Sequence, residues 1–219
     1  MDEMRQFREA AVTWAAGGVG APAAAAAAQG LAAGMGLRTV VLVEGISDLA
    51  ALEALAARRG RDLDEEGISV LPLGGATNIG RFLDLFGGGG LDAAPAGLCD
   101  AAEERYFRRG LERAGLGAGL TRTAMERLGF FVCDADLEDE LIRSLGTAAV
   151  EQVVDAEGDL RSLRTFQKQP AQQGRTAEKQ LQRFMGTTSG RKAHYAHALI
   201  DALDPTRIPR PLDRLLAHV

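Results

Sequence analysis

The stretch TVVLVEGISDLAALEALAARRG, residues 39–60, decides the fold. It opens with an unbroken apolar run from Val40 to Val43 in which most residues are β-branched. Such a run is typical of a strand that is buried on both faces, as in a parallel sheet. Glu44 and Gly45 follow the strand, and Asp48 stands where regularly spaced leucines predict a helix. The strand therefore delivers one carboxylate at its end and a second as the helix begins.

The rest of the chain alternates strands with helices as far as Gly146, after which only helical patterns follow. Further strands are predicted within residues 68–75, 95–100 and 127–146. This alternation predicts an α/β fold in which about four parallel strands form a Rossmann-like sheet flanked by helices. We expect an N-terminal helical extension (1–37), an α/β core (38–146) and a helical C-terminal part that completes the domain (147–219).

The composition is that of an acidic globular protein. The 219 residues carry a net charge of −5, so any binding to nucleic acid has to be local or mediated by a metal ion. No segment is apolar enough to span a membrane. Cys99 and Cys133 have neither zinc-site spacing nor that of a secreted disulfide framework, which predicts free thiols in a cytoplasmic protein.

One segment, residues 161–192, is locally basic, with eight basic residues against the single acid Glu178. It is either an ordinary exposed face or a surface that contacts nucleic-acid phosphates in a salt-sensitive, sequence-independent way.

Acidic residues follow three of the predicted strands. Glu44, Asp100 and Asp134 come directly after apolar runs, and Asp136 and Glu138 lie just beyond the last of them. Because the carboxyl ends of parallel strands meet at one edge of a sheet, these side chains are expected to converge. Crowded carboxylates repel one another, and a hard divalent cation, Mg²⁺ or Mn²⁺, relieves that repulsion.

Three glycines and Asp48 have two interpretations each. Gly45 allows either a sharp turn or the close approach of a phosphate, and Gly74 and Gly75 either end a strand or form a phosphate-binding loop before the next helix. Asp48 is either a helix cap or a second carboxylate of the site.

Four segments carry a resemblance to a known family: VVLVEGISDLAALEALA, VLPLGGATNIGRFL, GLCDAAEE and LEDELIRSLG. They resemble the TOPRIM domain of OLD (overcoming lysogenization defect) family nucleases over roughly residues 38–200. TOPRIM domains bind Mg²⁺ through a strand-end Glu and an Asp-x-Asp pair, and the OLD version adds a later Glu and a Lys. The resemblance thus implies a TOPRIM fold and a metal-dependent site.

The family's functional residues map onto this sequence one by one. Glu44 matches the strand-end Glu, a metal ligand and possible general acid or base, and Asp48 matches its companion acid. Asp100 matches the first acid of the pair. Glu138 matches the later Glu, and Lys192 matches the Lys that assists catalysis.

The sequence departs from the family pattern at the Asp-x-Asp pair. Where the second acid is expected, DAAE has Ala102, with Glu103 one residue later. Glu103 is a candidate substitute with a longer side chain. Asp136, in CDAD, is a secondary candidate for the same metal.

The resemblance implies a Mg²⁺-dependent phosphotransferase or phosphohydrolase, specifically a DNA nuclease. The alternative is a non-catalytic metal- or nucleotide-binding module that acts with a separate ATPase partner; its main support is the missing second acid of DAAE. A phosphatase-like enzyme with Asp100 or Asp134 as nucleophile ranks last, since it leaves Glu44 and Asp48 unexplained.

Overall fold

The computed structural model describes residues 3–87, 89–187 and 190–219. Within them, four parallel strands form one sheet in the order β2-β1-β3-β4. The strands are β1 (Thr39–Val43), β2 (Ile68–Pro72), β3 (Ala94–Cys99) and β4 (Phe130–Val132). The predicted α/β fold with a parallel sheet of about four strands is confirmed. β1 is an inner strand covered on both faces, which explains its unbroken apolar run.

The register of the sheet brings the ends of β1 and β3 together. Leu42 lies beside Gly97, so Glu44 and Asp100 follow neighbouring strands at the same edge. Gly97 permits this close pairing: a Cβ there would lie 2.7 Å from the carbonyl oxygen of Leu42 and 2.8 Å from the ring of Phe130. The glycine is thus required by packing rather than by backbone conformation.

A Gly97→Ala substitution should therefore lower the free energy of unfolding by about 3 kcal/mol, because the added methyl group must displace backbone and an aromatic ring. Gly30→Ala is the matched control, since nothing lies within 4 Å of a Cβ at that helical position. It should raise the stability by about 0.5–1 kcal/mol. Urea denaturation of both variants measures the difference, and equal stabilities would contradict this account of β3.

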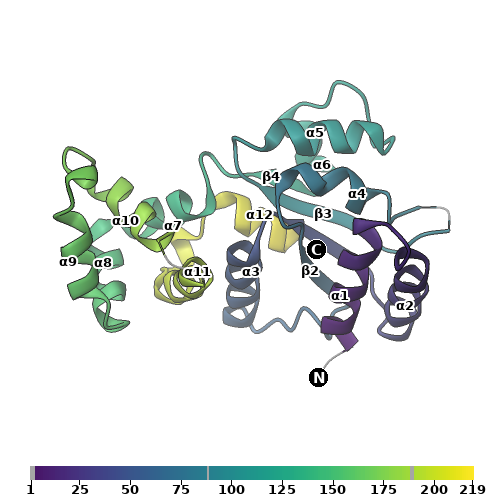
Figure 1. Cartoon of the computed structure of the whole chain (residues 1–219), viewed down its shortest axis with the longest axis horizontal. Helices are drawn as coiled ribbons and strands as arrows, with labels where there is room; N and C mark the ends of the chain where they lie inside the picture. The colour runs from purple at the N-terminus through teal and green to yellow at the C-terminus, as the bar shows by residue number, and fades with distance from the viewer. Residues whose placement is uncertain (1–2, 88, 188–189) are drawn as a thin grey trace.

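One face of the sheet is covered by helices from the first two-thirds of the chain (Figure 1). They are α1 (Glu3–Ala16), α2 (Ala21–Gly34), α4 (Ile79–Leu83), α5 (Glu104–Arg113) and α6 (Arg122–Arg127), with the 3₁₀ turn η1 (Ala76–Asn78) before α4. Phe7 and Ala11 of α1 are fully buried in this layer. The N-terminal extension is therefore packed against the core of the sheet.

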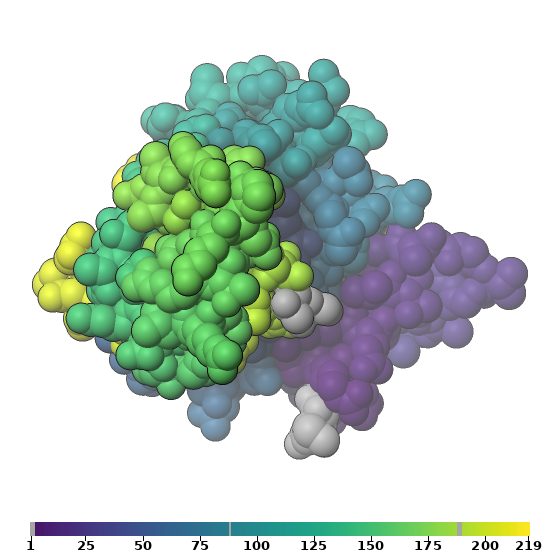
Figure 2. All heavy atoms as spheres, turned by 60° about the vertical axis from the view of Figure 1, so that its left-hand side comes forward, coloured from purple at the N-terminus to yellow at the C-terminus, as the bar shows by residue number. Residues whose placement is uncertain are grey.

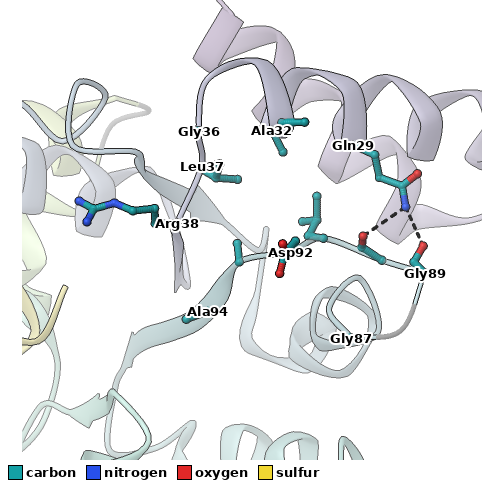
Figure 3. Close-up of a pocket in the computed structure, with 13 residues that line it drawn as sticks. Gln29, Ala32, Gly36, Leu37, Arg38, Gly87, Gly89, Asp92 and Ala94 are labelled. Atoms are coloured by element: carbon teal, nitrogen blue, oxygen red, sulfur yellow. Dashed lines mark hydrogen bonds between the residues drawn. The ribbon is translucent and has the colours of Figure 1, made fainter.

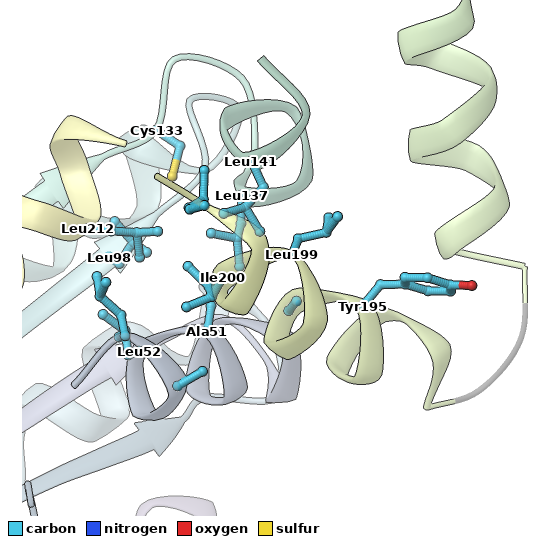
Figure 4. Close-up of a cluster of buried hydrophobic side chains, with 14 of the residues drawn as sticks. Ala51, Leu52, Leu98, Cys133, Leu137, Leu141, Tyr195, Leu199, Ile200 and Leu212 are labelled. Atoms are coloured by element: carbon cyan, nitrogen blue, oxygen red, sulfur yellow. The ribbon is translucent and has the colours of Figure 1, made fainter. Parts of the chain in front are cut away.

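The other face is covered by α3 (Ile46–Arg58), α7 (Leu137–Leu145), α11 (Arg191–Ala202) and α12 (Arg210–His218). Figure 4 shows Leu199 and Ile200 of α11 lying between Ala51 of α3 and the leucines of α7. The guanidinium of Arg58 donates to the carbonyl oxygens of Ile200 and Leu203. Arg58 ends α3, so the C-termini of α3 and α11 lie close together. Their N-termini lie at the opposite ends of the two helices, beside the carboxyl ends of the strands.

The remaining helices form a lobe at one end of the molecule, on the left of Figure 1. The lobe comprises α8 (Thr147–Ala156), α9 (Leu160–Gln167), the 3₁₀ turn η2 (Pro170–Gln172) and α10 (Ala177–Met185). It contacts α7 and α11. After the lobe and α11, the chain returns through η3 (Pro205–Arg207) to α12, which packs on β3 and β4. No helix in the described part of the chain is long and apolar enough to cross a membrane.

Candidate metal centre

The acids at the ends of β1 and β3 are in direct contact. The Oε1 atom of Glu44 accepts a hydrogen bond from the backbone N–H of Asp100 at 2.9 Å. Burial raises the pKa of Glu44; the hydrogen bond from Asp100 opposes this shift, while the charge of Glu103 adds to it. The strand register alone therefore places a partly desolvated carboxylate at this edge.

Asp48 lies where the strand end meets the first turn of α3. It lies in the first turn of α3, only 8% exposed, and its Oδ2 atom accepts the backbone N–H of Gly45 at 2.9 Å. It thus caps α3, and it also faces the cleft between the strand ends. Burial raises the pKa of Asp48 to about 7, opposed by the Gly45 hydrogen bond and assisted by Glu138 and Glu44.

Asp100 is the most strongly perturbed of these acids. Burial, followed by the charges of Glu44 and Asp48, raises its pKa to about 8, and Asp136 and Glu138 contribute further. Asp100 therefore combines burial, the main cause of its raised pKa, with a surplus of nearby negative charge.

Glu138 and Lys192 meet across the same cleft although they are far apart in sequence. Glu138, in the first turn of α7 and 5% exposed, accepts a hydrogen bond from Nζ of Lys192 at 3.2 Å through Oε2. Its other oxygen, Oε1, is buried and has no hydrogen-bond partner among the residues that the structure describes. Burial alone would lower the pKa of Lys192, but Glu138, Asp136 and Asp100 outweigh it and the net shift is upward. The ammonium group is therefore charged at neutral pH.

These groups line a cleft of about 520 Å³ at the carboxyl edge of the sheet. The residues of the cleft that were expected from the sequence are Glu44, Gly45, Asp48, Gly75, Asp100, Glu138 and Lys192. They come from the ends of β1 and β3, the loop after β2, and the first turns of α3, α7 and α11.

The cleft glycines differ in what they allow. Gly45 has an extended backbone (φ −151°), so it makes no turn that requires glycine, and a Cβ there would meet only Asp48 Oδ2, at 4.0 Å. Of its two interpretations, clearance for a ligand is the one that this geometry supports. Gly75 has φ +124° and donates its N–H to the carbonyl oxygen of Glu44 at 3.2 Å, so its conformation ties the loop after β2 to β1.

Four residues named from the sequence do not line the cleft: Gly74, Glu103, Asp134, which is exposed and pairs with Arg143, and Asp136. Gly74 has φ +65° and makes the turn after β2. Glu103 precedes α5 and acts on Glu44 through its charge. Asp136 caps α7, since Oδ1 accepts the N–H of Asp139 at 2.8 Å, and the side-chain amide of Gln182 donates to Oδ2.

Glu140 was missed by sequence reasoning. It is 6% exposed, accepts the N–H of Asp134 at 2.7 Å, and pairs with Arg143 at 2.8 Å. These contacts hold the loop between β4 and α7, the helix whose first turn carries Glu138. The only sequence signal was its place two residues after Glu138 in an acidic first turn.

The residues present suit a hard divalent cation by their chemistry. The donors are carboxylates, the Oε1 atom of Glu138 has no partner, and the pKa values of three acids are raised. In the part of the chain that the structure describes, however, no three acid, histidine or cysteine side chains stand close enough to hold a metal ion as they are. Binding a metal therefore requires side chains of the cleft to rotate toward one another.

A larger cavity than the cleft lies elsewhere. It measures about 1120 Å³ and is bounded by α2 and by the segment that leads into β3, near the amino ends of the strands (Figure 3). Gln29 donates to the carbonyl oxygens of Gly89 and Gly90 at its edge, and Arg38 and Asp92 are its only charged lining residues among those described. This composition offers no cluster of catalytic groups.

Comparison with known proteins finds a similar domain and a similar fold. The family model for the TOPRIM domain of overcoming lysogenization defect (OLD)-like proteins matches residues 37–100. The C-terminal region of the OLD protein from Xanthomonas campestris pv. campestris is 26% identical, with a TM-score of 0.64 over 83% of this chain and 94% of that one.

A second solved structure agrees in fold. The C-terminal region of the Burkholderia pseudomallei OLD protein is 23% identical, with a TM-score of 0.62 over 83% of this chain and 96% of that one. No curated protein matches the chain in sequence. These matches show that residues 37–100 are similar to the OLD-like TOPRIM domain and that the chain shares the fold of the C-terminal regions of OLD proteins.

Proposed function

We propose that the cleft binds Mg²⁺ or Mn²⁺ and that the protein is a metal-dependent phosphohydrolase, a DNA nuclease of the OLD type that acts in the cytoplasm. The observation that carries the proposal is the convergence of Glu44, Asp48, Asp100, Glu138 and Lys192 in one cleft. TOPRIM domains in general bind a divalent metal, and the acids here have the raised pKa values of a site built for a cation.

The carboxylates would act as metal ligands, and Glu44 would also act as a proton acceptor. Glu44, Asp100 and Glu138 would hold the metal, with Asp48 as a further ligand once its hydrogen bond to Gly45 is released. A bound divalent ion would supply positive charge to a phosphodiester and lower the pKa of a nearby water. Glu44, whose pKa is raised, is suited to take a proton from the attacking water.

Lys192 is the cationic group of the cleft. Its ammonium already donates to Glu138, and it stands in the first turn of α11, whose positive dipole end faces the same region. There it would stabilise negative charge that develops on phosphate oxygens. Gly45 would leave room for the phosphate beside Glu44.

A second candidate function is a metal- or nucleotide-binding module that acts with a separate ATPase partner. One observation favours it: the residue in place of the family's second Asp is Ala102, which is exposed and offers no ligand. Neither Glu103 nor Asp136 lines the cleft to replace it.

Metal removal separates the two candidates. Supercoiled plasmid and single-stranded DNA should be cleaved in Mg²⁺ or Mn²⁺, and EDTA should stop cleavage until metal is restored. If calorimetry shows Mn²⁺ binding while neither DNA is cleaved, the nuclease proposal is wrong and the binding module is supported.

A further inference from the structure

Helix α5 carries a row of arginines that lack acidic partners. Arg105, Arg109 and Arg113 are exposed and four residues apart, so they share one face of the helix. None of them forms an ion pair with any residue that the structure describes. We call these three residues the arginine row.

The acids of α5 are already engaged with other partners. Glu104 pairs with Arg122 at 2.7 Å, and Glu112 accepts the backbone N–H of Leu120 at 2.9 Å. Glu104 is thus neutralised by Arg122, whereas Glu112 keeps its negative charge beside Arg109 and Arg113, so the three arginines and this one acid leave a net positive charge on the row. Arg105 is engaged with Tyr106, on whose ring its guanidinium lies at 4.6 Å, so Arg109 and Arg113 are the cations of the row that suit an anionic ligand.

The arginine row borders a pocket of about 480 Å³ between α5 and the segment that begins α4. Its lining residues are Thr77, Ile79, Tyr106, Arg109, Glu112 and Arg113. Gly80 of α4 makes room for the side chain of Arg113, since a Cβ there would lie 3.1 Å from Nη2. The pocket thus combines two guanidinium groups with an aromatic ring, and the ring is held in place by the 2.7 Å hydrogen bond from Arg105 to the Tyr106 hydroxyl.

The pocket and the cleft are lined from nearby positions along two segments of the chain. Gly75 lines the cleft, and Thr77, two residues later, lines the pocket. Asp100 lines the cleft, and α5 begins four residues after it. Figure 2 shows the surface hollowed between the green lobe and the blue and teal segments that carry α4 and α5.

The basic segment 161–192 has fewer cations free to contact phosphates than its sequence indicated. Four of its eight cations are paired with acids: Arg164 with Glu151, Lys179 with Asp139, Arg191 with Asp159 and Lys192 with Glu138. Half of the basic charge of this segment is thus engaged with acids.

We infer that α5 and this pocket bind the nucleic-acid strand that leaves the cleft, with Arg109 and Arg113 on successive phosphates and Tyr106 stacked on a base. This inference rests on the proposed nuclease function and states where the nucleic-acid strand that flanks the cleavage site binds. Residues four apart on a helix rise by about 6 Å, close to the spacing of successive phosphates in an extended strand. Base stacking on tyrosine tolerates any sequence, so binding is non-specific and sensitive to salt.

The test is the affinity of the full chain for a fluorescein-labelled single-stranded oligonucleotide, measured by anisotropy over a range of salt concentrations. The double variant Arg109→Ala/Arg113→Ala should bind about 10–100-fold more weakly, and the slope of log K against log salt should fall by about 1.4, or 0.7 for each lost phosphate contact. Tyr106→Leu should weaken binding about tenfold with the slope unchanged.

The control is Arg207→Ala/Arg214→Ala, which removes the same charge from exposed positions beyond the C-terminus of α11, at the end of the molecule away from the cleft. It should bind like the wild type. Wild-type affinity and slope in Arg109→Ala/Arg113→Ala, or an equal loss in the control, would overturn the inference even if the protein cleaves DNA. If the wild type cleaves nothing but its binding depends on the arginine row, the nuclease proposal fails and the row remains a nucleic-acid site.

Discussion

Replacing Glu44 by glutamine should lower the rate of metal-dependent DNA cleavage by about 1000-fold, because the substitution removes both a metal ligand and the proton acceptor of the cleft. The variant should fold normally. The amide oxygen of glutamine can still accept the backbone N–H of Asp100, which is the contact that Glu44 makes. Initial cleavage rates on supercoiled plasmid in Mn²⁺, with thermal melting as a check on folding, measure the effect.

Glu65→Gln provides the control for this experiment. Glu65 is an exposed acid before β2, at the opposite end of the strands from the cleft, and its replacement removes the same charge. It should cleave DNA at the wild-type rate. A Glu44→Gln variant that also retained the wild-type rate would remove Glu44 from the chemistry.

Mn²⁺ affinity should rise steeply with pH between pH 6 and pH 8. A metal that binds through Asp100 has to displace the proton held there at low pH, and the pKa of this group is raised to about 8, mainly by burial and then by Glu44 and Asp48. Below its pKa, the affinity gains about tenfold for each pH unit, and the gain flattens as pH passes the pKa. For Asp100 alone the rise is on the order of 50-fold, and Asp48, with a pKa of about 7, adds to it.

Calorimetric titration of Mn²⁺ at several pH values measures this dependence, together with the protons released on binding. Asp100→Asn should bind more weakly and should lose most of the pH dependence between pH 7 and pH 8, leaving the smaller contribution of Asp48 at lower pH. An affinity that is flat across this range in the wild type would mean that these acids do not hold the metal.

Local patterns predicted the strands and the placement of two acids. The apolar run of β1 and the alternation of strands with helices depend on neighbouring residues, so they are readable from the sequence, and Glu44 and Asp100 follow from the rule that parallel strands end at one edge. The short helix α6 (Arg122–Arg127) was not predicted, because six residues offer little periodicity.

Long-range contacts account for what the sequence could not show. Lys192 reaches Glu138 across 54 positions, so only the family resemblance could pair them. Asp136 has the spacing of a metal ligand, yet the amide of Gln182, 46 positions away, donates to it while its other oxygen caps α7. The arginine row depends on where Glu104 and Glu112 find their partners, which local charge patterns do not reveal.

The most direct test of the metal centre is the binding of Mn²⁺ to the wild type and to Glu44→Gln at pH 8, measured by calorimetry without DNA. The convergence of Glu44, Asp100 and Glu138 predicts saturable binding in the wild type and at least about tenfold weaker binding in the variant. Equal binding by the two proteins, or none by the wild type, would contradict the assignment of this cleft as a metal site.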